Sequence, residues 1–168
     1  MCILYATPYN VDAIGFYFSS AGEFQDKVDK LRDHYGNPVE EFEIGYSDGD
    51  DPQLFEACGI NQCNLATWFD DVESLDDHQK PALFYLCDAN GYSLSDALDK
   101  LDDVCLYEGR LIDAASELFD ECYAAEIPEN LRFYIDYEAF ARNCQLSGDM
   151  YEFELDGTTW TVTNASGV

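Results

Sequence analysis

The sequence contains few basic residues. Its 168 residues include 8 Lys and Arg against 35 Asp and Glu, which gives a formal net charge of −27 at pH 7. A small domain commonly carries a net charge of magnitude about 2–8, so mutual repulsion among these carboxylates costs stability. Because phosphate binding requires Lys and Arg, we expect no direct binding to nucleic acid and none to an anionic membrane surface.

The chain also lacks long apolar runs and paired cysteine motifs. No stretch approaches the roughly 18 consecutive apolar residues of a membrane span, and the start of the chain has no signal-peptide pattern. The seven cysteines are odd in number and include no Cys-x-x-Cys pair, which argues against a disulfide framework and a zinc site. We therefore expect reduced, mostly buried thiols in a cytoplasmic protein.

Signals for catalysis are equally scarce. The two histidines, His34 and His78, stand alone, and the sequence has no Gly-rich phosphate loop. The acidic segment that begins at Asp48 departs from a calcium loop, because its sixth position is Gln53 and its twelfth is Gly59. We expect no catalytic residues, no metal ligands, no cofactor and no enzyme activity, although a Cys–His nucleophile stays open as an alternative.

Residues that can form a core are nevertheless abundant. The hydrophobic fraction is 47% and the aromatic fraction 15%, whereas disordered acidic segments lack aromatic residues. The length fits one domain or two to three small ones. The sequence therefore predicts a folded protein of the α+β class rather than an acidic tail, and we divide it into domains 1–60, 61–103 and 104–168.

The first predicted domain has α+β character and the second is helical. Apolar and aromatic runs predict strands over residues 2–7, 14–18 and 42–46, and a helical pattern covers residues 22–35. In the second domain, helices are predicted over residues 65–75, 81–88 and 95–101.

The third predicted domain is again α+β. It begins with a short strand over residues 104–107 and a strongly amphipathic helix over residues 110–125. A second helix restarts at Ile127 and runs to about residue 141. The clearest strand signal in the chain is a hairpin at its end, with Asp156-Gly157 as a two-residue turn and Phe153 opposite Trp160.

Many carboxylates recur at helical spacing. Asp113, Glu117 and Glu121 are four residues apart, although like charges at this spacing destabilise a helix by about 0.2–0.5 kcal/mol per pair. Each step advances about 6 Å along a helix axis, comparable to the distance between neighbouring phosphates on a DNA strand. The carboxylates that we expect to imitate phosphates are Glu40, Glu41, Asp70, Asp71, Glu73, Asp76, Asp77, Asp96, Asp99, Asp103, Asp113, Glu117, Asp120, Glu121 and Glu126.

The charge as a whole also matches that of a stretch of DNA. Duplex DNA carries one charge per about 1.7 Å of axis, so 27 charges correspond to about 46 Å of duplex. A row of helix carboxylates is, however, most often a solvated face. On composition alone, DNA mimicry, a halophilic surface and an acidic adaptor for another partner all stay open.

A specific signature lies between Ile127 and Arg142. It reads Ile127-Pro128-Glu129, followed by Tyr134-Ile135-Asp136-Tyr137-Glu138-Ala139-Phe140-Ala141-Arg142. This segment resembles the C-terminal signature of the ArdA antirestriction proteins, with Phe140 where Tyr is common. Tyr9-Asn10 and Gly15-Phe16-Tyr17-Phe18 are similar to the opening of that family, with Tyr17 in place of the usual Trp.

The resemblance implies an architecture and an activity. ArdA proteins are elongated DNA mimics of three small domains in a row, carried by plasmids, transposons and phages, and they form homodimers through the C-terminal domain. They occupy the DNA-binding groove of type I restriction–modification enzymes, at the methyltransferase core and its specificity subunit, so that incoming foreign DNA escapes cleavage.

The resemblance also places a short antirestriction motif at roughly residues 114–126. For this motif and the nearby dimer contact it implies Leu118, Phe119, Tyr123, Tyr134 and Tyr137. Two alternatives stay open beside it, namely an acidic decoy or adaptor for another basic DNA-binding protein and a small enzyme with a cryptic site.

Overall fold

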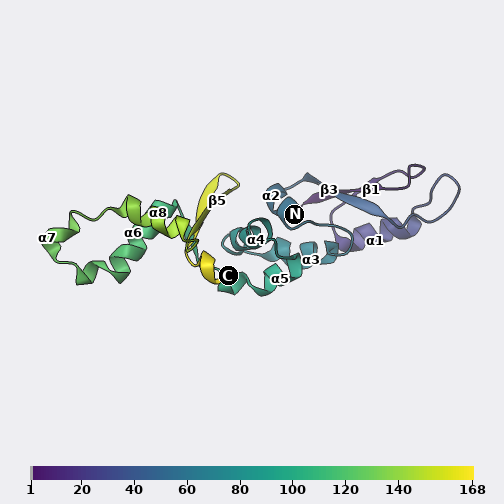
Figure 1. The fold of residues 1–168 in the computed structure, drawn as a ribbon. Helices are drawn as coiled ribbons and strands as arrows, with labels where there is room; N and C mark the ends of the chain where they lie inside the picture. The colour runs from purple at the N-terminus through teal and green to yellow at the C-terminus, as the bar shows by residue number, and fades with distance from the viewer. Residues whose placement is uncertain (1) are drawn as a thin grey trace. The chain divides into compact units, whose positions relative to one another are not determined.

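The computed structural model describes residues 2–168 and shows a mixed α+β protein (Figure 1). Within these residues it contains eight α-helices and two antiparallel sheets of three strands each. The chain divides into two compact units, one ending at Leu94 and the other covering Ser95–Val168. The predicted α+β class is confirmed, whereas the division into three domains stays a prediction.

The first unit begins with a sheet that one helix covers. β1 (Ile3–Pro8) is the central strand, flanked by β2 (Phe16–Phe18) and β3 (Phe42–Asp48), and α1 (Ala21–Lys30) follows β2. Phe24 of α1 packs against the rings of Phe16, Phe18 and Phe42, with centroid distances of 5.9, 5.0 and 5.7 Å. The three predicted strands are therefore present, and aromatic side chains fix the helix on one face of the sheet.

Helix α1 is shorter than the sequence predicts. It ends at Lys30 rather than at residue 35. The side chain of Asp33 accepts hydrogen bonds from the backbone N–H groups of Tyr35 and Asn37, at 2.9 and 2.8 Å. Such local bonds offer the backbone an alternative to the helical pattern, so the chain turns away before the predicted end of the helix.

The rest of the first unit is helical. It contains α2 (Pro52–Ala57), α3 (Leu65–Asp70), a 3-10 turn (Val72–Ser74) and α4 (Gln79–Asp88). Helix α2 was not predicted, although Pro52 stands at its first turn, a favoured position for proline. The predicted helix over residues 65–75 is interrupted after Asp70, and Asp76 then accepts the N–H groups of His78 and Gln79 where α4 begins.

The second unit combines a sheet with a helix pair. Its elements are β4 (Leu106–Glu108), α6 (Leu111–Cys122), α7 (Glu129–Arg132), α8 (Tyr137–Leu146), β5 (Tyr151–Leu155) and β6 (Thr158–Val162), with 3-10 turns at Leu101–Asp103, Ala124–Glu126 and Ala165–Gly167. Helix α5 (Leu94–Asp99) precedes them. The sheet order is β4-β6-β5, with all pairs antiparallel.

The predicted hairpin is confirmed in detail. Phe153 pairs with Trp160 and Tyr151 with Val162. Asp156 and Gly157 have φ values of 49° and 79°, as a tight hairpin turn of this kind requires.

A small apolar cluster joins α6, α8 and Met150, the residue before β5. Its buried members are Leu111, Ala115, Ala141 and Met150. The second helix predicted for this domain is divided into α7 and α8, because Asp136 accepts a hydrogen bond from the N–H of Ala139 and starts a new helix.

The stability of the first unit depends on its buried aliphatic side chains. Leu83 of α4 has no exposed surface, and Trp68 of the same unit is 1% exposed. We expect Leu83→Ala to lower the free energy of unfolding by about 2–5 kcal/mol, because the substitution leaves a cavity. Urea unfolding monitored by Trp68 fluorescence in a Trp160→Phe background measures the change. Ile14→Ala, at a side chain that is 83% exposed, is the control, and equal midpoints for the two variants would contradict the prediction.

The stability of α1 should depend on the ionisation of Glu23. The ion pair with Lys27 and the hydrogen bonds from Ser19 lower the pKa of Glu23 from 4.5 to about 2. A lowered pKa contributes stability above pH 4.5, and this contribution disappears as the pH falls through about 2. Wild type should therefore exceed Glu23→Gln in unfolding free energy above pH 4.5 and match it at the acid limit. A difference that is independent of pH would refute this assignment.

Candidate partner-binding surface

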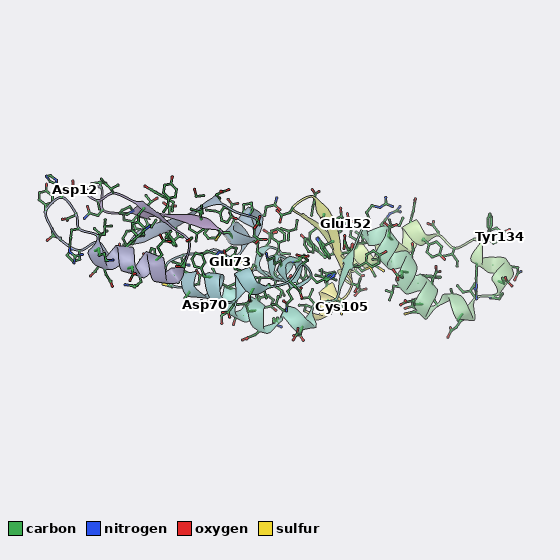
Figure 2. All side chains as sticks on the ribbon, turned by 180° about the vertical axis from the view of Figure 1, so that it is seen from behind. Asp12, Asp70, Glu73, Cys105, Tyr134 and Glu152 are labelled. Atoms are coloured by element: carbon green, nitrogen blue, oxygen red, sulfur yellow. The ribbon has the colours of Figure 1, made fainter. Side chains whose placement is uncertain are left out.

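Exposed carboxylates are spread over both units. Even if each of the 8 Lys and Arg side chains paired with its own carboxylate, 27 carboxylates would have no basic partner. Figure 2 shows such oxygen-tipped side chains on helices and loops alike. Of the expected phosphate mimics, those that are exposed are Glu40, Glu41, Asp70, Asp71, Asp76, Asp77, Asp96, Asp99, Asp103, Asp113, Glu117, Asp120, Glu121 and Glu126.

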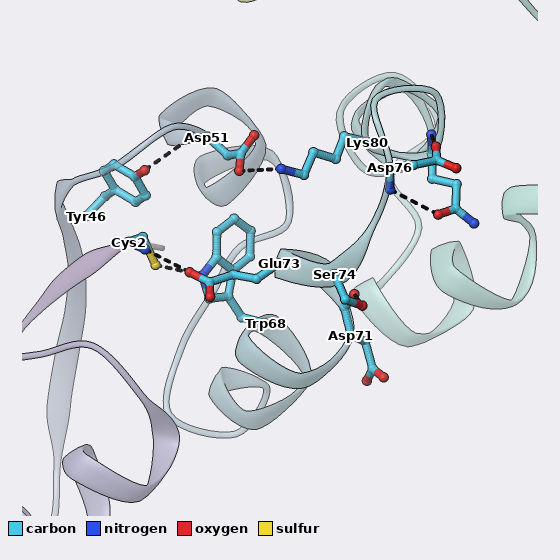
Figure 3. A network of polar contacts seen from close by, with 10 residues as sticks. Cys2, Tyr46, Asp51, Trp68, Asp71, Glu73, Ser74, Asp76 and Lys80 are labelled. Atoms are coloured by element: carbon cyan, nitrogen blue, oxygen red, sulfur yellow. Dashed lines mark hydrogen bonds and ion pairs between the residues drawn. The ribbon is translucent and has the colours of Figure 1, made fainter.

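Glu73 differs from the others because it is half-buried and has a tertiary contact. Its carboxylate accepts a hydrogen bond of 2.8 Å from the backbone N–H of Cys2 (Figure 3). The indole N–H of Trp68 donates to the sulfur of Cys2 at 3.2 Å, and burial raises the pKa of this thiol to about 11. Glu73 therefore holds the start of β1 against the 65–74 segment, a structural role that the sequence did not reveal.

Asp76 also has a local structural role while it stays exposed. Hydrogen bonds from the N–H groups of Gln79 and His78 lower the pKa of this carboxyl below its usual value. Nearby, Lys80 forms an ion pair of 2.8 Å with Asp51, which in turn donates its backbone N–H to the hydroxyl of Tyr46 (Figure 3). The contacts of Asp76 fix a negative charge at the start of α4.

The predicted acidic row of Asp113, Glu117 and Glu121 lies entirely within helix α6. Asp113, Glu117 and Glu121 are all exposed on it. Asp113 pairs with Arg110 at 3.0 Å. The hydroxyl of Tyr137 donates to Asp120 at 2.5 Å, and this bond raises the pKa of Tyr137.

Two other sets of acidic residues recur at helical spacing in the sequence, but each set crosses the end of a helix. The row of residues 70, 73 and 77 crosses the end of α3 at Asp70 and the 3-10 turn that follows. The row of residues 96, 99 and 103 crosses the end of α5 at Asp99. Their carboxylates are therefore not placed by one helix, and the regular step of about 6 Å holds only where four residues lie in one α-helix.

The residues assigned to the antirestriction motif fall into two groups. Leu118 packs on the apolar cluster of the second unit. The ring of Phe119 contacts those of Tyr123, Tyr137 and Phe140, with centroid distances of 5.5, 5.6 and 5.1 Å. These side chains link α6 to α8, so a large part of the motif stabilises the helix pair.

Tyr134 belongs to an exposed apolar segment that follows α7. Tyr134 is 78% exposed and Phe133 beside it is 90% exposed, and Figure 2 labels Tyr134 on this segment. Phe133 is not among the predicted residues, because the pattern of the sequence predicts one helix over residues 127–141. The signal that could have shown it is Asp136, a residue type that favours helix starts and implies a break before it.

Within residues 2–168, no group of three or more His, Cys, Asp and Glu side chains is arranged to hold a metal ion. Nor does any helix in this part of the chain have both the length and the apolar character needed to cross a membrane.

Comparison with known proteins identifies the family. The sequence model of the family described as Antirestriction protein (ArdA) matches residues 15–157, which include most of both units. No curated protein matches the chain. Because the match extends over far more than half of the sequence, this chain belongs to the ArdA family of antirestriction proteins.

Proposed function

We propose that this protein is a DNA mimic that occupies the DNA-binding groove of a type I restriction–modification enzyme, at the methyltransferase core and its specificity subunit. Membership of the ArdA family implies the antirestriction function. The observation that carries the mimicry is the excess of exposed carboxylates in both units. The mechanism is competitive occupancy without catalysis or cofactor, and it protects foreign DNA that enters the cytoplasm.

The groove of a DNA-binding enzyme presents Lys and Arg side chains at positions that suit phosphates. Carboxylates of this chain can pair with those side chains in place of phosphates. In α6 they recur at steps of about 6 Å on exposed positions. The spacing of the carboxylates along this helix therefore approximates the spacing of the phosphates along a DNA strand.

Two of these carboxylates are held in place before a partner binds. Asp76 accepts two backbone N–H groups, and Asp113 is oriented by Arg110. A side chain that is already ordered loses less entropy on binding. Such carboxylates resemble the phosphates of a stiff duplex more closely than mobile surface side chains do.

Electrostatics predicts how the complex should behave. A net charge of −27 steers the protein toward a basic groove and makes association fast. Dissolved salt screens the attraction, so affinity should fall steeply with ionic strength. Binding also relieves the repulsion within the free protein, because the groove supplies the missing positive charge.

The mimicry can be tested by competition for a purified type I methyltransferase with a labelled duplex that carries its recognition sequence. We expect the protein to displace the duplex. The triple variant Asp113→Asn, Glu117→Gln, Glu121→Gln should compete at least about tenfold less well at low salt, and this difference should shrink as salt is added.

The control for that experiment keeps the charges and exchanges the acids, as Asp113→Glu, Glu117→Asp, Glu121→Asp, and should compete nearly as well as wild type. Equal competition by the neutralised and the charge-retaining variants would contradict mimicry by α6. Loss of all activity on substitution of one residue elsewhere would instead favour an enzyme with a cryptic site. Competition for an unrelated basic DNA-binding protein, but not for this enzyme, would favour the adaptor.

We also propose that the second unit forms a homodimer through its exposed apolar segment. Phe133 and Tyr134 of this segment are 90% and 78% exposed, and Tyr123 and Leu131 before it are 50% and 49% exposed. Exposed apolar patches of this kind mark protein–protein contacts. Association of two chains that each carry −27 is opposed by repulsion. Added salt should therefore strengthen the dimer while it weakens binding to the enzyme.

The dimer can be tested by sedimentation at moderate salt. We expect wild type to sediment at twice the monomer mass of 19.0 kDa and the variant Phe133→Ser, Tyr134→Ser to sediment as a monomer, because it loses the most exposed part of the patch. Leu146→Ser, at a side chain that is also 78% exposed, is the matched control and should remain dimeric. An unchanged mass for the Phe133 and Tyr134 variant would place the dimer contact elsewhere.

A further inference from the structure

Two neighbouring loops of the first unit expose large apolar side chains at one end of its sheet. We call them the tip, and they consist of residues 9–15 and 31–38. The first loop joins β1 to β2, and the second leads from α1 toward β3, whose first residue pairs with the last residue of β1. Val11 is 94% exposed and Ile14 83% exposed, and Tyr9 and Tyr35 are also largely exposed. Figure 2 labels Asp12 in the first of these loops.

The two loops of the tip hold one another. The backbone N–H of His34 donates to the carbonyl oxygen of Asp12 at 2.9 Å. The side-chain amide of Asn10 donates to Asp33 at 3.3 Å. Both loops thus have a defined conformation, and the apolar side chains are presented on an ordered surface.

Close packing at Gly15 fixes the first loop further. A Cβ atom at this position would lie 2.5 Å from the carbonyl oxygen of Ala6 and 2.5 Å from the hydroxyl of Tyr5. Only glycine therefore allows the chain to approach β1 this closely. The loop is anchored at its end while Val11 and Ile14 remain outside the core.

We propose that the tip is a docking surface for a basic protein surface that carries an apolar spot, on the same restriction–modification enzyme. This inference rests on the proposed function and names an additional contact within that complex. The partner is identified by charge complementarity, because exposed Glu40 and Glu41 line a hollow beside Tyr9 at this end of the unit. The same charge argues against a second copy of this chain, since Glu40 and Glu41 of one copy would face like charges of the other.

The tip supplies a kind of contact that the carboxylates cannot. Charge pairs at the rim of an interface steer association and are screened by salt, whereas buried apolar anchors hold the complex and respond little to salt. A DNA strand offers no aliphatic side chain at the positions of its phosphates. The tip therefore gives the protein an anchor that the competing DNA lacks.

The test compares affinities for the purified methyltransferase over a range of salt concentrations. The tip variant Val11→Ser, Ile14→Ser leaves the net charge unchanged and removes the apolar anchor. We expect it to bind about tenfold more weakly at every salt concentration, with the same slope of log Kd against log salt as wild type. Tyr35→Ser, a second variant in the other loop, should also weaken binding at constant slope.

Leu146→Ser, an exposed aliphatic side chain of the second unit, serves as the control and should bind as wild type does. Unchanged urea midpoints should show that the tip variants are folded, because the substituted side chains lie outside the core. Wild-type affinity in both tip variants would overturn the docking surface while leaving the DNA mimic in place. A changed salt slope would also overturn it, since the tip would then act through charge, and failure of wild type to bind would instead refute the proposed function.

Discussion

Repulsion among carboxylates is the constraint under which both units fold. With 35 Asp and Glu against 8 Lys and Arg, the chain cannot neutralise itself by ion pairs. Each unit offsets the repulsion by burying apolar side chains, around Trp68 and Leu83 in the first and around Leu111 and Met150 in the second. Burial of apolar surface is the main favourable contribution to folding and does not depend on charge. The acidic surface is therefore compatible with a stable fold.

The same carboxylates also organise the local structure. Asp33 ends a helical pattern and Asp136 starts a helix, since side-chain oxygens that accept backbone N–H groups stabilise turns and helix starts. Apolar and aromatic runs predicted the strands of the first unit, and the strong alternation around Asp156-Gly157 predicted the register of the final hairpin. The helix breaks at Asp33 and Asp136 were not predicted, because side-chain acceptors compete with the helical pattern there. Nor could the sequence predict the bond between Glu73 and Cys2, which joins residues 71 positions apart.

The proposed function depends on the carboxylates and the apolar side chains that both units expose. Exposed carboxylates in both units can pair with the Lys and Arg side chains of any basic groove. Carboxylates whose positions are fixed by neighbouring groups suit a groove that binds regularly spaced phosphates. Val11 and Ile14 of the apolar tip and Phe133 and Tyr134 after α7 are among the most exposed large apolar side chains of the described residues. In the proposed function, charge directs the protein to DNA-binding enzymes as a class, and the proposed apolar contacts select the partner and the second copy.

The most direct test of this account is the plating efficiency of unmodified phage on a host with a type I restriction system, with and without the expressed protein. We expect expression of the protein to restore plating. The variant Asp113→Asn, Glu117→Gln, Glu121→Gln should restore plating less well at equal expression. Unchanged plating with folded wild-type protein present in the cells would contradict the claim that this protein blocks such an enzyme.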